Sequence, residues 1–306
     1  MSEARIEAWR ARIDRVVDHV QRHPDGDLRL ETLAALACFS PFHFHRIFKT
    51  VTGETLGGFI GRIRLEKAAR RMMAQPGTAL LTIALECGFE SASGFSRAFR
   101  RRFGIAPSRW DRVTPLKERN LGKEAGHFPV YTVDELAAAD GEGRFETAFF
   151  HYPRQRLAVI RVENAYSAFD RIRAAHDRLA AWYGEAVAPV TGMMLYGMSH
   201  DDPEITPLEQ CRFDWAAVVP EAISVAAAGI RFREMPACTV AAVRARGDVQ
   251  VLDRAWQYLW RFSLPRSGFE PIDLPAMEVY VTPPAVLGWA TYDMWCAVPV
   301  QRSKET

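Results

Sequence analysis

The stretch IALECGFESASGFSRAFRRRFG, residues 83–104, decides the fold of the N-terminal part of the chain, because a second copy of its pattern lies upstream. That copy is LAALACFSPFHFHRIFKTVTG, residues 33–53, whose Ser40, Phe48 and Gly53 recur 51 residues later. In each copy a short apolar helix is followed by a tight turn, a serine that can cap the next helix, and a glycine that can end it. The pattern predicts two helix-turn-helix units.

A single long helix is predicted between the two units, over residues 54–74, with Phe59, Ile63 and Ala69 toward the core. A helix of about 20 residues is roughly 30 Å long, close to the roughly 34 Å pitch of B-DNA. We therefore expect it to hold two recognition helices in successive major grooves on one face of the DNA.

These units resemble the AraC/XylS family of transcriptional regulators. The resemblance covers about residues 10–112 and rests on the Gly-Phe turn, the Phe-Ser-Arg-Ala-Phe core and the end at Gly104 and Pro107. It implies a DNA-binding domain with two reading helices. The second reading helix departs from the family in offering the small residues Ala92, Ser93 and Gly94, which predicts weaker or water-mediated base contacts there.

Exposed side chains of the two recognition helices are the candidates for DNA contact. Arg46 and His45 are expected at base edges, since arginine can bridge O6 and N7 of guanine, and a phosphate contact or internal salt bridge is the alternative for Arg46. Arg102, at the end of the second helix, is expected to clamp phosphate with its neighbours. The predicted DNA-binding set is Phe42, His45, Arg46, Lys49, Ser93, Ser96, Arg97, Arg100 and Arg101.

Charge divides the chain near Lys117. The 306 residues include 39 basic and 37 acidic side chains, and 48% are apolar, which is typical of a globular protein of about two domains. Residues 1–117 carry 20 Lys/Arg against 12 Asp/Glu, a balance of +8, whereas residues 118–306 carry 19 against 25, a balance of −6. The basic half suits a polyanion such as double-stranded DNA, and the acidic half suits a neutral or cationic ligand.

The sequence also predicts the cellular location of the protein and the absence of a cofactor or metal. No window approaches the roughly 18 apolar residues of a membrane span, and the N-terminus is charged where a signal peptide needs an apolar core. We therefore expect a cytoplasmic protein with no membrane partner. No cofactor and no metal are predicted, since the scattered cysteines are expected to be buried thiols. The cysteines are Cys38, Cys87, Cys211, Cys238 and Cys296.

The acidic half repeats as well, at an offset of 83 residues that brings Arg161 onto Arg244 and Asp170 onto Asp253. Each copy is expected to contain a strand, a helix and two more strands. The expected elements are 156–162, 168–182, 191–198 and 213–219, then 239–245, 251–262, 277–282 and 291–298. This order predicts two βαββ (SHS2-like) units related by a pseudo-twofold axis, with a groove where they meet.

Residues 146–300 resemble the GyrI-like effector-binding domains of the Rob/BmrR type. The resemblance rests on PAMEVYV at 275–281 and on AVPV at 297–300. In that family a glutamate of a Glu-x-Tyr strand lies in a central pocket and meets cationic, aromatic ligands. Glu278 is the matching residue, and Met194 is its expected counterpart in the other repeat.

Strand alternation places Glu278 and Tyr280 on one face of their strand. A carboxylate beside an aromatic ring in an apolar groove suits an organic cation, through charge pairing and cation–π attraction, whereas the alternative is a solvent-facing glutamate. Asp214 and Asp293 are expected to be structural or surface pairs rather than catalytic carboxylates. The predicted ligand-binding residues are Glu278, Tyr280, Tyr196, Trp215, Trp256 and Trp295, with Trp260 as a further candidate.

The expected architecture is therefore an all-α domain at 1–113, a linker at 114–145 and an α+β domain at 146–306. The favoured function is a ligand-responsive transcription regulator that binds promoter DNA and senses a small hydrophobic or cationic effector. One alternative is a hydrolase with Glu278 as general base. Another is a protein-interaction module that contacts RNA polymerase. An alkyl-transfer sensor is disfavoured because no cysteine lies in a clustered metal site.

Overall fold

The computed structural model describes most of the chain in two compact units, Met1–Pro115 and Leu116–Thr306. The first is helical and the second combines an antiparallel sheet with helices, so the predicted two-domain α+β architecture is confirmed at this level. Within the described helices none is long and apolar enough to cross a membrane. The described residues are 3–75, 77–110, 131–141, 145–167, 169–187, 189–201, 205–224, 227, 229–272 and 274–303.

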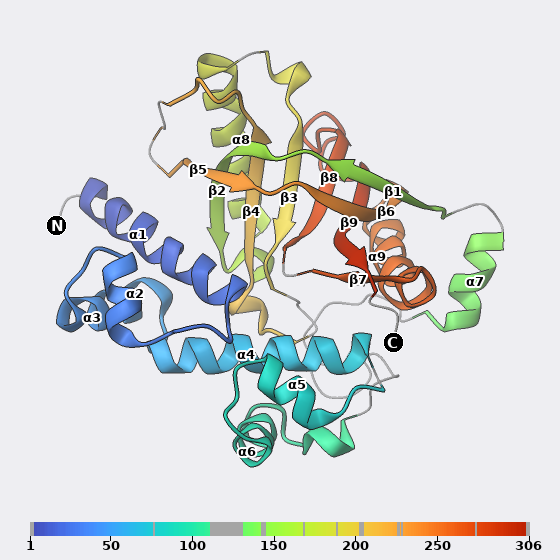
Figure 1. The fold of residues 1–306 in the computed structure, drawn as a ribbon. Helices are drawn as coiled ribbons and strands as arrows, with labels where there is room; N and C mark the ends of the chain where they lie inside the picture. The colour runs from blue at the N-terminus through green and yellow to red at the C-terminus, as the bar shows by residue number, and fades with distance from the viewer. Residues whose placement is uncertain are drawn as a thin grey trace. The chain divides into compact units, whose positions relative to one another are not determined.

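The first unit contains both predicted helix-turn-helix pairs, α2 with α3 and α5 with α6, and α4 runs between them (Figure 1). Ser40 Oγ caps α3 by accepting from His43 N, and Ser91 Oγ caps α6 by accepting from Gly94 N. α1, which precedes the first pair, was not among the sequence predictions. The helices are α1 (Glu3–Arg22), α2 (Leu30–Leu36), α3 (Pro41–Thr52), α4 (Leu56–Ala74), α5 (Leu80–Glu86) and α6 (Ala92–Phe103).

Each helix-turn-helix pair packs through two phenylalanines of its second helix. Phe44 and Phe48 of α3 are fully buried, as is Phe99 of α6, and Phe95 of α6 is 1% exposed. Phe59 of α4 meets Phe48 with ring centroids 5.5 Å apart, which ties α4 to the first pair. Burial of such side chains stabilises each pair by roughly 1.5–3 kcal/mol per residue.

The turn inside each pair needs a residue in the left-handed backbone conformation, and the two pairs use different residues there. The first uses Cys38 (φ 52°) and the second uses Gly88 (φ 81°). A Cβ at Gly88 would lie 2.7 Å from Pro24 O and 2.8 Å from Arg64 Nε, so only glycine fits there. Cys38 is exposed, so the prediction of a buried thiol is wrong at this position, whereas the other four cysteines are buried.

The second unit follows the predicted order of strand, helix and two strands in both repeats. The first repeat has β2 (Gln155–Glu163), α8 (Phe169–Ala186), β3 (Leu195–Ser199) and β4 (Arg212–Val218). The second has β6 (Cys238–Gly247), α9 (Val249–Gln257) with a π-helical turn at Tyr258–Ser263, β8 (Ala276–Thr282) and β9 (Tyr292–Arg302). Three short strands were not predicted, namely β1 (Thr147–Tyr152), β5 (Arg231–Met235) and β7 (Phe269–Pro271).

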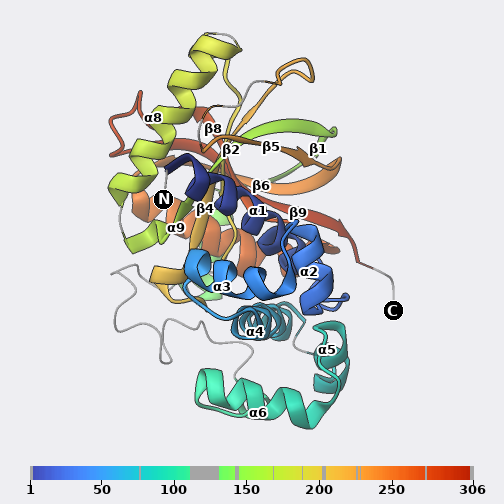
Figure 2. The ribbon, with the colours of Figure 1, turned by 90° about the vertical axis from the view of Figure 1, so that its left-hand side faces the viewer.

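The described strands form one antiparallel sheet in the order β1-β6-β9-β8-β3-β4-β2-β5, with β7 beside β9. α8 and α9 cover the same face of this sheet (Figure 2). α8 packs on it through a core that includes Leu179 and Trp215, and α9 through a core that includes Leu259 and Cys296. The opposite face carries a third core that includes Tyr196 and Met277.

The predicted linker at 114–145 is only partly described. Residues 111–130 and 142–144 lie outside the described residues. Between these two ranges the structure contains a helix, α7 (Val133–Gly141). The sequence has no sustained periodicity there, and we therefore expected a linker rather than a helix. Leu136 and Ala139 of α7 are fully buried in the core that includes α9, so this helix is part of the second unit.

Candidate ligand site and DNA-reading surface

The candidate ligand site lies at the centre of the helix-covered face of the sheet. Cross-strand pairing runs from Trp215 to Gly197, from Gly197 to Glu278 and from Glu278 to Cys296. Directly paired residues point to the same side of a sheet. Glu278 therefore lies in the row between the aromatic core under α8 and the core under α9.

Gly197 makes room for the Glu278 carboxylate. A Cβ at position 197 would lie 2.8 Å from Glu278 Oε2 and 2.5 Å from Phe213 Cζ. Any larger residue in this position of β3 would push the carboxylate or the Phe213 ring aside. This role could not be predicted from the sequence, because a glycine within a strand usually marks a bulge or a bend.

Burial raises the pKa of Glu278, although the hydroxyl that Tyr280 donates to Glu278 Oε2, at 2.5 Å, acts in the opposite direction. The carboxylate also acts on three tyrosines around it. Burial first, and then the charge of Glu278, raise the pKa values of Tyr280, Tyr166 and Tyr292. Glu278 and Tyr280 are half-buried as whole residues.

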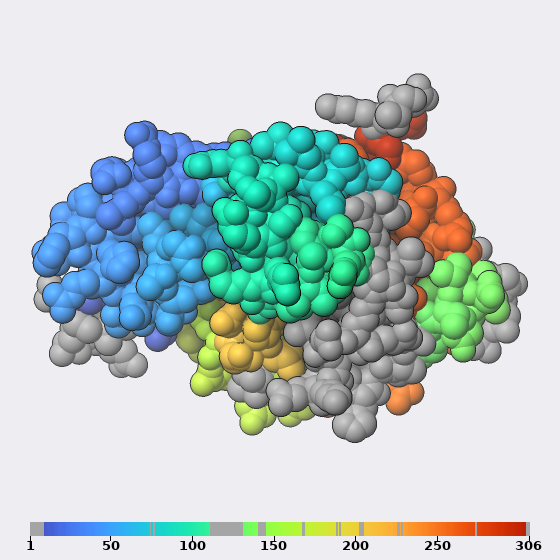
Figure 3. Space-filling model, turned by 90° about the horizontal axis from the view of Figure 1, so that it is seen from below, coloured from blue at the N-terminus to red at the C-terminus, as the bar shows by residue number. Residues whose placement is uncertain are grey.

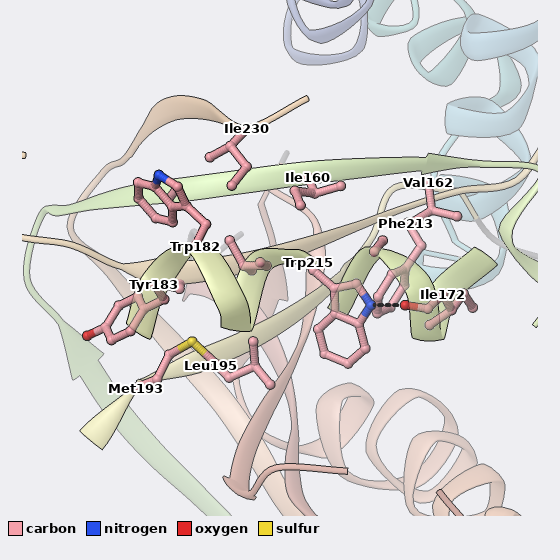
Figure 4. Close-up of a cluster of buried hydrophobic side chains, with 14 of the residues drawn as sticks. Ile160, Val162, Ile172, Trp182, Tyr183, Met193, Leu195, Phe213, Trp215 and Ile230 are labelled. Atoms are coloured by element: carbon pink, nitrogen blue, oxygen red, sulfur yellow. Dashed lines mark hydrogen bonds between the residues drawn. The ribbon is translucent and has the colours of Figure 1, made fainter. Parts of the chain in front are cut away.

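An aromatic wall continues from Tyr280 toward α8. The ring of Trp215 lies 5.3 Å from that of Tyr280 and 5.1 Å from that of Phe213. Trp215 is 1% exposed, and its indole Nε1 donates to Ile172 O of α8 at 2.9 Å, as Figure 4 shows. The hydrogen bond to α8 thus fixes the orientation of the Trp215 indole, which packs against Tyr280 and so supports the site.

The structure brings together only some of the predicted ligand-binding residues. Glu278, Tyr280 and Trp215 share one face, which was expected. Tyr196 and Trp295 pack in the core on the opposite face, because each pairs with Val279, the neighbour of Glu278 that points away from it. The prediction that these two line the same groove as Glu278 is therefore wrong.

Trp256 packs against the core under α9, which includes Cys296, the cross-strand neighbour of Glu278, and its part in the ligand site stays a prediction. One further expectation for this face is wrong. Met194, the expected counterpart of Glu278, precedes β3 and is 46% exposed, whereas Leu195 is the residue that packs under α8. Trp260 lies on the π-helical turn and is 40% exposed.

The aromatic contacts of the site include two residues that the sequence did not single out. His176 of α8 lies with its ring centroid 5.2 Å from Trp215 and 5.1 Å from Trp289. Trp289 belongs to the turn between β8 and β9, where no periodic pattern could indicate its direction. The prolines and the glycine of PPAVLGWAT, residues 283–291, predict a turn, but they do not predict which core the turn packs against.

A separate shallow hollow lies on the opposite face of the sheet. Its lining is mainly apolar and includes Met198, Met235 and Met277, while Glu278 is not part of it. Since the hollow holds no enclosed carboxylate, the helix-covered face around Glu278 is the stronger candidate for a cation. No group of three or more His, Cys, Asp or Glu side chains within the described residues is arranged to hold a metal ion.

Asp214 and Asp293 form ion pairs, as predicted. Asp214 is fully buried and accepts from Arg161 at 2.8 and 3.0 Å, with His200 Nε2 2.7 Å away. Burial alone would raise the pKa of Asp214, but Arg161 and then His200 outweigh it and hold that pKa well below its usual range. Asp293 meets Arg244 at 2.6 Å near the other end of the sheet.

The predicted DNA-reading residues lie on the outer faces of α3 and α6. On α3 the side chains of Phe42, His45, Arg46 and Lys49 are exposed, and Phe42 reaches 72% exposure. On α6 the side chains of Ser93, Arg97, Arg100 and Arg101 are exposed, and Ser96 is half-buried. Residues 80–110, teal in Figure 3, form part of the surface seen in that view.

Arg102 does not join this surface, contrary to the expectation of a phosphate clamp. Its guanidinium lies 3.7 Å from Glu66 of α4, which is 2% exposed and also pairs with Arg62 at 3.2 Å. A buried carboxylate between two guanidinium groups links α4 to α6. Arg102 therefore helps to set the position of α6, and Arg100 and Arg101 remain the predicted phosphate contacts.

Comparison with known proteins matches two separate segments of the chain to two families. Residues 33–112 match a helix-turn-helix domain family, and residues 146–298 match the family described as a GyrI-like small molecule binding domain. The transcriptional regulator Rob of Salmonella typhimurium is 39% identical over 206 residues, 66% of each chain. The right origin-binding protein of Escherichia coli K12 is 39% identical over 95 residues, which cover 30% of this chain and 32% of that one.

Solved structures give more distant likenesses. The C-terminal domain of EcmrR is 16% identical, with a TM-score of 0.42, and covers 52% of this chain and 99% of that one. The DNA-binding domain of AdpA in complex with a target DNA is 29% identical, with a TM-score of 0.30, and covers 31% of this chain and 86% of that one. The chain thus spans about two thirds of Rob and about one third of the right origin-binding protein.

Proposed function

The chain belongs to the family with a GyrI-like small molecule binding domain, here joined to an AraC-type helix-turn-helix domain, and from this premise we propose that it is an effector-responsive transcription regulator. The domain at 1–113 binds promoter DNA, and the domain at 146–306 senses a lipophilic, aromatic cation. Binding of the effector changes the DNA-bound state or its contact with RNA polymerase, because the effector favours one arrangement over another.

The observation that carries the sensing half is the enclosed carboxylate of Glu278. It lies in the row between two apolar cores, accepts a hydrogen bond from Tyr280 and acts on the tyrosines Tyr166 and Tyr292. An unpaired carboxylate in such surroundings is costly unless a cation joins it. Aromatic rings beside it add cation–π attraction, so a lipophilic cation fits better than a neutral or anionic molecule.

Calorimetric titration tests this half of the proposal. Tetraphenylphosphonium is titrated into the wild-type chain and into Glu278→Gln, which keeps the shape of the side chain and removes its charge. We expect binding by the wild type and at least about a tenfold loss in the variant, equivalent to about 1.4 kcal/mol. Equal binding by both would refute charge recognition by Glu278. Slow conversion of an ester or amide probe, lost in Glu278→Gln, would instead favour the hydrolase alternative.

The DNA-binding half of the proposal is supported by the exposed polar faces of α3 and α6. Arg46 and Arg97 occupy equivalent positions on the two helices, and both are exposed. α4 has 19 residues, about 28 Å at 1.5 Å per residue, so it suits two helices in successive major grooves. The small residues at the start of α6 favour α3 as the stronger reader of base edges.

Selection from random duplexes, followed by anisotropy titration, tests the assignment of these residues. We expect Arg46→Ala to cost about 1–3 kcal/mol and to relax preference at one base position. Arg100→Ala should weaken binding to all sequences and reduce the salt slope by about 1. Arg29, which is 77% exposed and pairs with Asp27 before α2, provides the control, since Arg29→Ala should change neither property.

We infer that the effector domain consists of two βαββ halves related by a pseudo-twofold axis. The orders β3-β4-β2 and β8-β9-β6 are the same, and each half follows the same sequence of strand, helix and two strands, which supports this relation. β3 and β8 pair at the junction, and Glu278 lies on β8 beside Gly197 of β3. The effector site would then lie where the halves meet.

A further inference from the structure

The turn between β8 and β9, residues 283–291, brings one indole from the surface onto the candidate ligand site. The turn is held by local hydrogen bonds, including Val286 N to Pro283 O and Trp289 N to Pro284 O, both at 3.0 Å. Val286 at its tip is 72% exposed. The backbone of this turn therefore depends little on the helices beneath it.

The Trp289 side chain, by contrast, reaches into the aromatic wall. Its ring centroid lies 5.1 Å from His176, 5.9 Å from Phe169 and 6.2 Å from Trp215. Trp215 in turn contacts Tyr280, which donates to Glu278. The indole of Trp289 thus covers the aromatic surface that leads to the carboxylate.

The backbone at the tip of the turn is strained. Gly288 and Trp289 both have positive φ, at 66° and 63°. Glycine adopts this conformation freely, whereas a bulky residue such as tryptophan rarely does. Such strain persists only where other contacts hold the residue, here the hydrogen bond from Trp289 N to Pro284 O and the contacts of the indole ring. The strain lowers the free energy needed to move Trp289 from this position.

His176 supplies an independent indication that a ligand can bind at the position that the Trp289 indole occupies. The side chain is 4% exposed, and Nδ1 pairs with Asp177 at 3.0 Å. Nε2 is buried and has no hydrogen-bond partner among the described residues, and its ring lies between two indoles. Buried polar atoms are nearly always paired, so this nitrogen is available to a polar atom of a ligand.

We propose that Trp289 is a movable plug: it occupies an aromatic subsite formed by Trp215 and His176, and the aromatic part of the effector enters by displacing it. This inference rests on the proposed function, because Glu278 would hold the charged end of the same molecule. The ligand class is a cation whose aromatic body extends from Glu278 toward α8. Since displacement of the indole opposes binding, the empty protein binds effectors more weakly than an unplugged one.

The test uses the full chain, two probes and matched tryptophan variants. The probes are tetraphenylphosphonium and the neutral compound N-phenyl-1-naphthylamine. We expect Trp289→Ala to bind both about tenfold more tightly than the wild type, because the plug is gone. Trp289→Phe should give a smaller gain. Trp260→Ala removes a half-exposed indole from the π-helical turn and should bind both probes as the wild type does.

The direction of the effect separates a plug from a structural residue, whose removal would weaken binding. A folded Trp289→Ala protein, or Trp289→Phe if the alanine variant does not fold, that gains no affinity for the neutral probe would overturn the proposal. A gain for the neutral probe alone, with no binding of the cation by any variant, would support the plug and refute the cation-sensing function. Cation binding that depends on Glu278 but not on Trp289 would support the cation-sensing function and refute the plug.

Discussion

At the scale of single residues, Glu278 should make binding of the proposed effector depend on pH. Burial raises the pKa of this carboxyl above its ordinary value, and only the ionised form attracts a cation. As pH falls through the raised pKa, protons compete with the cation, so we expect the affinity for tetraphenylphosphonium to fall. At higher pH the affinity should reach a plateau. Calorimetry across pH would measure this, and Glu278→Gln should remove the dependence; a flat wild-type profile would contradict it.

Asp214, a fully buried carboxylate in the same domain, is expected to act on stability instead. It is enclosed by Arg161, His200 and two more arginines 3.7–3.8 Å away. Asp214→Asn leaves this positive charge without its counterion, so we expect a loss of roughly 3–5 kcal/mol in the free energy of unfolding by urea. Asp293→Asn serves as the control and should cost roughly 1 kcal/mol, because Asp293 is 15% exposed. Equal losses would contradict this assignment.

The pKa of Asp214 also sets the sign of the acid response. Its pKa is held well below the usual range in the folded protein, so the stability it provides is present above the ordinary pKa of aspartate and is lost as pH falls through the folded value. Glu278 has the opposite sign. Its raised pKa means that the folded state holds its proton more tightly than the unfolded chain does, so stability falls as pH rises through that window. The ligand site thus costs stability where it is charged.

At the scale of elements, substitutions in the turns of the two helix-turn-helix pairs should have opposite effects on stability. Cys38 has φ 52°, a conformation that costs a non-glycine residue about 1–2 kcal/mol. Cys38→Gly should therefore stabilise the first unit by about 0.5–1 kcal/mol, after the added flexibility of the unfolded chain is subtracted. Gly88→Ala should destabilise it by about 2–3 kcal/mol, because the new Cβ would meet Pro24 O and Arg64. Thermal unfolding would measure both, and a stabilising Gly88→Ala would contradict the argument.

The elements also show how far a sequence can predict this structure. Serine caps, closing glycines and paired phenylalanines are local signals, and they predicted both helix-turn-helix pairs. The period-two pattern placed Glu278 with Tyr280, because alternation follows from strand geometry. It could not tell which face Tyr196 or Trp295 would share, since one residue of register reverses the face. The folding of Trp289 onto His176 depends on a turn whose direction no local pattern determines.

At the scale of the whole molecule, the two units have separate cores. α3 and α4 pack around Phe48, whereas α8 and α9 pack on the sheet. Their charges also differ, with a balance of +8 over residues 1–117 and −6 over residues 118–306. A polyanion and a cation should therefore bind to different units. This separation makes the proposed division at 1–113 and 146–306 open to a thermodynamic test.

We expect scanning calorimetry of the full chain to show two transitions that respond to different ligands. Tetraphenylphosphonium at 100 times its Kd should stabilise the effector domain by about 2.7 kcal/mol and raise only that transition. Selected operator DNA should raise only the other. Phe48→Ala identifies the DNA-binding transition by lowering it, since a buried phenylalanine lost from a core costs about 3–5 kcal/mol. Glu278→Gln should abolish the shift caused by the cation but not the shift caused by DNA. A cation-induced shift of the transition that Phe48→Ala lowers would place the cation in the first unit and contradict the proposed division.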